Sequence, residues 1–146
     1  CPDMQLDQVP HRTLNDALSE QIRKVRPDTV LTHWEHDLNL DHCAVARSTT
    51  VATRLGASGV RRVWAYEVPS SSEWQTSAAF EPTVFFGIGG QLATKLEAFT
   101  CYVDEVREFP HPRSAQGIET LARYRGIQSG MQAAEAFRLV KAYEAA

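Results

Sequence analysis

Three histidines and three carboxylates lie within one short segment, His33 to His42, which reads HWEHDLNLDH. Imidazole nitrogens and carboxylate oxygens together suit a divalent metal such as zinc. Asp41 directly precedes His42, and a carboxylate that orients a ligand histidine is common beside metal sites. Histidine and aspartate are also ordinary loop and helix-capping residues. Spacing alone therefore leaves open a capping role for Asp41 and metal contacts for His33 and His36.

The elements around this segment determine where its side chains lie. Thr29–Thr32 is short, apolar and β-branched, which indicates a buried strand. His33–Asp41 is polar and aperiodic like a loop, and a helical pattern begins at His42. The segment therefore runs from the carboxyl end of a strand to the start of a helix. Open α/β sheets bind their ligands at this edge.

The remaining pattern predicts an α/β protein. A helix follows Thr13, its expected N-cap, and ends at Pro27. Further strands are expected at 60–68 and 83–88, and further helices at 92–106, 115–125 and 131–143. This order predicts a single domain over residues 1–146 with a three-layer α/β/α Rossmann-like sheet. Because the pattern shows few strands for such a sheet, we expect its N-terminal strands to be missing from this chain.

Composition argues against several classes of function. A net charge of -3 provides no basic surface for nucleic acid. No apolar run approaches the roughly 18–20 residues that a membrane helix needs, and the first residues do not resemble a signal peptide. The three cysteines form no CxxC pair, so we expect a reduced, cytoplasmic location.

Several segments together resemble the PIG-L/LmbE-like zinc-dependent N-deacetylases. Thr32-His33-Trp34, followed by Asp37 to His42, is similar to the second metal motif of that family. Further similar segments follow in the family's order: Tyr66–Trp74, Phe80–Pro82, Lys95, Phe109–Ser114 and Ala134–Phe137. The resemblance covers nearly the whole chain, and several segments in the right order are more specific than one short motif.

The resemblance implies a zinc-dependent hydrolase that removes an N-acetyl group from an amino sugar or a similar amide. It implies that His42 is a zinc ligand. We assign orientation of His42 to Asp41 and donation of a hydrogen bond to the oxyanion to Asn39, at a position where some members carry a histidine. Substrate contacts are assigned to Asp37 and Arg113. The expected partner is a small N-acetylated molecule, with neither nucleic acid nor a membrane involved.

The sequence departs from the family at the other half of the expected metal site. The family's N-terminal His-Pro-Asp-Asp-Glu-like motif supplies two further zinc ligands and the general base, and no such motif occurs here. The one His-Pro pair, His111-Pro112, is followed by Arg113 and Ser114. We therefore expect this chain alone to be inactive. We also expect its sheet edge to be covered by a second copy in a homo-oligomer or by a missing N-terminal segment.

Two other functions remain open. The chain could be a non-catalytic, truncated deacetylase that acts as an interaction module or as one part of a heteromer. It could also be an HD-type metal phosphohydrolase, because Asp41-His42 is an HD pair. Those domains are all-helical, so the strands expected at 29–32 and 60–68 argue against the second alternative.

Overall fold

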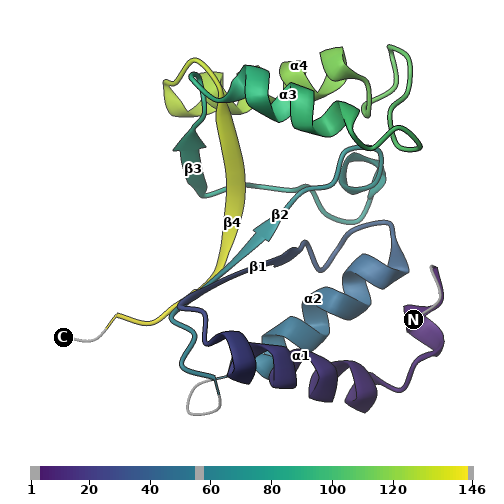
Figure 1. The fold of residues 1–146 in the computed structure, drawn as a ribbon, viewed down its shortest axis with the longest axis vertical. Coiled ribbons are helices and arrows are strands. Elements are labelled where there is room, and N and C mark those ends of the chain that lie inside the picture. Colours follow the sequence, from purple (N-terminus) through teal and green to yellow (C-terminus); the bar gives the residue numbers. More distant parts are fainter. Residues whose placement is uncertain (1–3, 55–57, 145–146) are drawn as a thin grey trace. The chain divides into compact units, whose positions relative to one another are not determined.

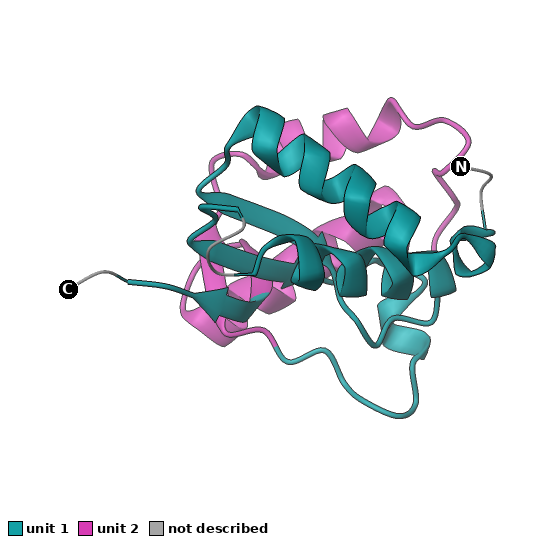
Figure 2. Ribbon diagram, turned by 90° about the horizontal axis from the view of Figure 1, so that it is seen from below, with its two compact units in different colours: residues 1–81, 138–146 teal, residues 82–137 magenta. Residues whose placement is uncertain are grey.

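The computed structural model describes residues 4–54 and 58–144. The chain divides into two compact units, residues 1–81 with 138–146 and residues 82–137 (Figure 2). Its strands follow the order β1-β2-β4-β3, and β4 (Ala134–Ala142) contributes its first residues to unit 2 and the rest to unit 1. The described residues form a four-stranded sheet accompanied by α-helices, so the expected α/β class is confirmed.

Unit 1 is built around two parallel strands joined by a helix. β1 (Thr29–His33) and β2 (Arg62–Tyr66) pair in parallel, and α2 (Leu40–Ala52) connects them, as parallel pairing requires. α1 (His11–Val25) packs against α2, and Figure 1 shows both helices on the same side of the two strands. Their core consists of Ile22, Ala52, Val60 and Val63, with Leu18 and Val30 packed against it.

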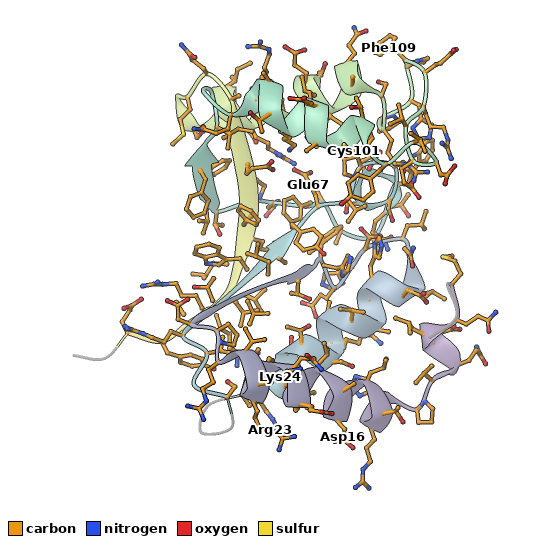
Figure 3. All side chains as sticks on the ribbon, viewed as in Figure 1. Asp16, Arg23, Lys24, Glu67, Cys101 and Phe109 are labelled. Atoms are coloured by element: carbon orange, nitrogen blue, oxygen red, sulfur yellow. The ribbon has the colours of Figure 1, made fainter. Side chains whose placement is uncertain are left out.

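The first helix confirms its predicted pattern but begins earlier than expected. Thr13 lies inside the first turn of α1 rather than before it, because its backbone N–H donates to the Pro10 carbonyl at 2.8 Å. The apolar face of the helix packs on the core, as its spacing predicts. Asp16, Arg23 and Lys24 are exposed, and Figure 3 shows Asp16 and Arg23 on the side of α1 that faces away from the strands.

β1 confirms the strand expected at 29–32, but only part of it is buried. Thr32 is 4% exposed, and its hydroxyl donates to Thr49 of α2 at 3.2 Å, which ties the strand to the helix. Leu31 points to the opposite face, as neighbours in a strand do, and is 52% exposed. β1 is also an end strand in the strand order.

Unit 2 consists of an antiparallel strand pair and two helices. β3 (Val84–Gly87) pairs with the first residues of β4. α3 (Leu92–Thr100) and α4 (Ala115–Ser129) pack together, with Leu92, Ala122 and Ala133 in their core. Ser114 caps α4, because its hydroxyl accepts a hydrogen bond from the Gly117 N–H at 2.9 Å.

The helix predicted for residues 131–143 is wrong. α4 ends at Ser129, and the next residue, Gly130, turns the chain with a φ of 72°, in the left-handed conformation that glycine adopts easily. The following residues pair with β3, with Ala134 opposite Gly87 and Glu135 opposite Phe86. Pairing with a neighbouring strand thus overrides the helical spacing.

The observed elements also bear on the HD-type alternative and on the presence of membrane-spanning helices. Four strands, not the three visible in the sequence pattern, are present among the described residues, which excludes the all-helical HD-type alternative. No helix within residues 4–54 and 58–144 is long and apolar enough to span a membrane.

Candidate functional site

The carboxyl ends of β1 and β2 bring three rings together in unit 1. His33 ends β1 and Tyr66 ends β2, and the parallel register pairs these two residues. The Tyr66 hydroxyl lies 3.1 Å from Nε2 of His33. The loop after β1 then brings His42 of α2 onto His33, with ring centroids 4.2 Å apart and ring planes at 14°. The strand edge therefore holds a stacked pair of imidazoles.

Asp37 is the centre of a hydrogen-bond cluster beside this stack. Its side chain is 0% exposed. Its Oδ1 accepts from the Asn39 backbone N–H at 2.9 Å and pairs with Nδ1 of His42 at 3.0 Å. The hydroxyls of Ser71 and Ser72 donate to Oδ1 and Oδ2, respectively. Both carboxylate oxygens are thus satisfied, which makes burial of the group tolerable.

These bonds determine the charge of Asp37 and the tautomer of His42. Burial raises the pKa of Asp37, but hydrogen bonds from Ser71, Ser72 and the Asn39 backbone, together with the nearby His42, bring the pKa below its ordinary value. An ionised carboxylate can only accept hydrogen bonds, so Nδ1 of His42 carries the shared proton. In the neutral imidazole, Nε2 then keeps a free lone pair, which is the form that binds a metal.

The loop after β2 supplies the two serines. The Ser70 N–H donates to the Glu73 carboxylate at 2.6 Å, and the Val68 N–H donates to the Ser72 hydroxyl at 2.8 Å. These bonds hold the short 3₁₀ helix η2 (Ser72–Trp74) against the end of β2. From sequence alone, the serine run at 70–72 is compatible with a solvated turn and with substrate contacts after a strand. Its position after a parallel strand was the signal that could have placed it beside the loop after β1.

The Asp41 carboxylate hydrogen-bonds to the Leu6 backbone, whereas Nδ1 of His42 pairs with Asp37. Oδ1 of Asp41 accepts from the Leu6 N–H at 2.9 Å, which ties the 3₁₀ helix η1 (Leu6–Gln8) to the start of α2. Successive residues of a helix do not face each other, so Asp41 and His42 point in different directions. Asp37 makes the orienting contact that the sequence assigned to Asp41. The Asp37 side chain is fully buried, and the substrate contact expected of it stays a prediction.

Asn39, and not Asp41, is the N-cap of α2. Its Oδ1 accepts from the Asp41 N–H at 2.8 Å, so α2 begins at Leu40 rather than at His42. Its Nδ2 faces the sulfur of Met4 at 3.4 Å. Sulfur is a weak acceptor, so the amide N–H groups of Asn39 are available to a stronger one.

Two other candidates, His36 and Arg113, pair with carboxylates other than Asp37. The side chain of His36 is 54% exposed, and its ring nitrogen lies 3.7 Å from the Glu35 carboxylate. Arg113 lies in unit 2, where its guanidinium forms an ion pair with Glu105. The substrate contact expected of Arg113 stays a prediction.

Among the described residues, His42 is positioned to supply one ligand of a metal site. Within residues 4–54 and 58–144, no group of three or more His, Cys, Asp or Glu side chains is placed to hold a metal ion. Nε2 of His42 has the right chemistry for one ligand. His33 cannot share an ion with it in this arrangement, because imidazole binds metals in its ring plane at about 2.0–2.1 Å. The two planes are nearly parallel and stacked.

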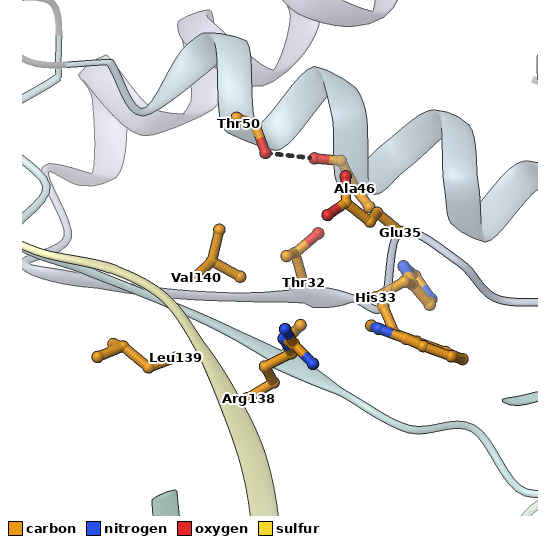
Figure 4. A pocket seen from close by; sticks show the side chains of 10 residues that line it. Thr32, His33, Glu35, Ala46, Thr50, Arg138, Leu139 and Val140 are labelled. Atoms are coloured by element: carbon orange, nitrogen blue, oxygen red, sulfur yellow. Dashed lines mark hydrogen bonds between the residues drawn. The ribbon is translucent and has the colours of Figure 1, made fainter. Parts of the chain in front are cut away.

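A cavity of about 220 Å³ adjoins the cluster (Figure 4). It is lined by Thr32, His33, Trp34, Glu35, Ala46, Thr50, Ala65, Arg138, Leu139 and Val140, all of unit 1. Glu35 and Arg138 bring opposite charges to it. The lining includes His33 but neither His42 nor Asp37, so the cavity borders the stacked imidazoles without containing the Asp37 cluster.

The free energy of unfolding is expected to fall as the pH drops from about 6.5 to about 4. Burial and repulsion from His42 lower the pKa of His33 from 6.5 to about 4, although Asp37 acts in the opposite direction. Within this window the unfolded chain binds a proton at His33 that the folded chain does not. Because His33 is partly exposed, we expect a total loss of about 1–2 kcal/mol rather than the full effect of the shift.

Urea unfolding at a series of pH values, on the wild type and on His33→Phe, measures this loss. The variant should lose that part of the pH dependence. The pKa of Asp37 is lowered from its ordinary value of 3.8, so the stabilisation from this carboxylate is lost only as the pH falls below 3.8. The effects of His33 and Asp37 therefore fall in different pH ranges. Parallel pH curves for wild type and variant would contradict the role of His33.

Comparison with known proteins supports the resemblance that the motifs indicate. Residues 1–53 match the PIG-L family model, described as GlcNAc-PI de-N-acetylase. That stretch contains His33, Asp37, Asn39 and His42. No curated protein sequence matches the chain.

Solved structures show the same fold. The conserved protein TT1542 of Thermus thermophilus is 22% identical, with a TM-score of 0.75 over 100% of this chain and 66% of its own. N,N'-diacetylchitobiose deacetylase of Pyrococcus horikoshii, complexed with its inhibitor MPG, is 15% identical, with a TM-score of 0.72 over 97% of this chain and 55% of its own. The 4-carboxy-2-hydroxymuconate hydratase GalB of Pseudomonas putida KT2440 is 20% identical, with a TM-score of 0.68 over 92% and 61%. This chain thus spans less than two thirds of each.

Proposed function

We propose that this chain forms one part of the active site of a PIG-L-type N-deacetylase, which hydrolyses an N-acetyl amide such as that of an amino sugar. The observation that carries the proposal is the pairing of His42 with the buried Asp37 carboxylate at 3.0 Å. It leaves Nε2 of His42 free at the strand edge, inside the stretch that the family model matches. A carboxylate–histidine pair of this kind is the usual support of a metal ligand.

Two residues of the cluster, His42 and Asp37, have a definite part in the proposed metal site. His42 would hold a metal through Nε2, and Asp37 keeps the proton on Nδ1 and sets the direction of that nitrogen. A bound zinc ion would lower the pKa of a water molecule and polarise the amide carbonyl. The resemblance places the other two ligands and the general base in a His-Pro-Asp-Asp motif, which this chain does not contain.

The overall reaction is hydrolysis of a C–N bond. The general base removes a proton from water, the oxygen adds to the amide carbon, and negative charge develops on the carbonyl oxygen. Asn39 can donate an Nδ2–H to that oxygen in place of its weak bond to Met4. The C–N bond then breaks as the nitrogen gains a proton, and acetate and a free amine are released. Asn39 cannot deliver that proton, because an amide is not an acid at neutral pH.

Zinc titration of the 146-residue chain tests the metal assignment. We expect weak binding centred on His42, because zinc sites normally have at least three protein ligands and one is supplied here. Isothermal titration calorimetry should show that His42→Ala removes this binding, while His36→Ala, the matched control in the same loop, leaves it unchanged. A tight one-to-one complex that survives His42→Ala would refute the assignment.

We also infer that the outer edge of β1 is covered by a second copy of the chain or by an N-terminal segment. β1 is an end strand with Leu31 exposed, and uncovered strand edges promote association. The 146-residue chain is therefore expected to sediment as a dimer or larger species, and Leu31→Lys should shift it toward monomer. A wild-type chain that is monomeric at all concentrations would contradict self-association.

A non-catalytic role as an interaction module is the second candidate. It is favoured by one observation, that no metal-holding cluster is formed by residues 4–54 and 58–144. This role predicts that the Asp37 cluster stabilises the fold without any effect of His42 on chemistry.

A further inference from the structure

One buried polar atom beside the proposed metal ligand has no explanation in the proposed reaction. His33 cannot share an ion with His42, yet its ring stacks on the ring of His42. Its Nδ1 is buried and has no hydrogen-bond partner among the described residues. An unsatisfied buried nitrogen costs stability. An apolar ring of similar size would avoid that cost, so the imidazole should contribute something else.

The hydrogen bond to Asp37 fixes His42 incompletely. The contact between Nδ1 and Oδ1 sets the direction of one ring nitrogen. It leaves the ring able to tilt about the axis of that bond, and such a tilt swings Nε2 away from any fixed point. A second constraint, directed at the plane of the ring, is needed to hold Nε2 in place. Ligand direction matters because a metal is bound in the plane of the imidazole.

The stack provides this second constraint, and Tyr66 holds the stack. The His33 ring covers a face of His42 at a centroid distance of 4.2 Å, which opposes tilting. His33 is itself held by the 3.1 Å contact between its Nε2 and the Tyr66 hydroxyl. The parallel register of β1 and β2 places His33 and Tyr66 opposite each other. The orientation of His42 therefore depends on two strand ends as well as on Asp37.

We propose that His33 and Tyr66 are positioning residues, which fix the plane of the His42 ring through the stacked imidazoles and the tyrosine hydroxyl. The consequence for metal binding rests on the proposed function, whereas the orientation of His42 does not. Neither residue needs to touch substrate or metal. The loss of one hydroxyl in Tyr66→Phe should change the orientation of the His42 ring, although the two residues lie on different elements.

Long-range ¹H–¹⁵N spectra of the histidine rings in the 146-residue chain test the proposal. In the wild type, His42 should show one dominant tautomer with the proton on Nδ1. Tyr66→Phe should loosen this preference and broaden or shift the His42 signals, and His33→Ala should do so more strongly. Tyr102→Phe, an exposed tyrosine of unit 2, is the matched control and should leave His42 unchanged. Circular dichroism confirms that each variant is folded.

A zinc titration followed through the same signals separates the two levels of the proposal. Tyr66→Phe should weaken zinc binding at His42 by about tenfold, as loss of a ligand's support does. If the His42 signals change but zinc affinity does not, the positioning role stands and the assignment of His42 as a metal ligand fails. If folded Tyr66→Phe gives His42 signals identical to those of the wild type, the positioning role is overturned. Tyr66→Phe keeps the ring, so this variant remains informative even if His33→Ala does not fold.

Discussion

Replacing Asp37 with alanine is expected to lower the free energy of unfolding by about 3 kcal/mol, the loss typical of breaking a buried charged network. The carboxylate accepts from both serine hydroxyls, the Asn39 backbone and His42, and has no exposed side-chain surface. Alanine would leave these donors without their acceptor. The loop after β1 and the loop after β2 would also lose the contact that joins them.

Urea unfolding at neutral pH measures this effect on the 146-residue chain. Asp37→Asn should lower the free energy of unfolding less than Asp37→Ala does, because the asparagine carbonyl oxygen can still accept a hydrogen bond. Some loss should remain, since the asparagine NH₂ group would face donors. Asp16→Ala is the matched control on the exposed face of α1 and should change the free energy of unfolding by less than about 0.5 kcal/mol. A loss for Asp37→Ala as small as that of the control would show that the buried network is not formed.

The second large effect concerns catalysis. In a polypeptide that carries these residues together with a His-Pro-Asp-Asp segment, His42→Ala is expected to reduce acetate release by at least about 100-fold. Loss of a ligand's supporting partner already costs about 10–100-fold in metal affinity or activity, and loss of the ligand itself should cost more. Added zinc should not restore the variant. Restoration of full activity by zinc, or an unchanged rate, would contradict the role of His42.

Two neighbouring substitutions serve as graded controls in the same assay. Asp41→Asn should have little effect, because an asparagine Oδ1 can still accept from the Leu6 N–H and Nδ1 of His42 pairs with Asp37 instead. Asn39→His should leave the rate unchanged or raise it, since histidine can both donate a hydrogen bond and deliver a proton. The cap of α2 would weaken at the same time.

The sequence predicts where the site lies better than it predicts which residues contact each other within it. Local patterns correctly predict a strand that leads into the His33–His42 segment and a helix that leads out of it, although β1 includes His33 and α2 already begins at Leu40. The partner of His42 was not predictable from adjacency. Asp41 is next to it in the chain, but Asp37 reaches it because the loop folds back before the helix starts.

Contacts between segments that are distant in the sequence are also not predicted by local patterns. Ser71 and Ser72 meet Asp37 only because β1 and β2 are parallel neighbours whose carboxyl ends share an edge. Tyr66 meets His33 for the same reason. Residues 134–142 have apolar spacing compatible with both a helix and a strand, and pairing with β3 makes them the strand β4. Strand register and pairing depend on segments that are distant in the sequence, so the local spacing of apolar residues does not determine them.

The fold itself does not identify the reaction. A deacetylase and a hydratase, N,N'-diacetylchitobiose deacetylase and GalB, both share it with this chain. Function on a common fold depends on the side chains of the site. In this chain, His42, its buried partner Asp37 and the family match over residues 1–53 are the features that point to a deacetylase.

The measurement that tests this account most directly is acetate release from an N-acetylglucosamine-type substrate in the presence of zinc. We predict turnover by a polypeptide that joins these residues to a His-Pro-Asp-Asp segment and none by the 146 residues alone. Loss of the general base typically costs about 10²–10⁴ in rate, before loss of the other metal ligands is counted. Robust turnover by the 146 residues alone, or none by the joined polypeptide when it is folded and zinc-bound, would contradict the assignment of this chain as one part of a deacetylase site.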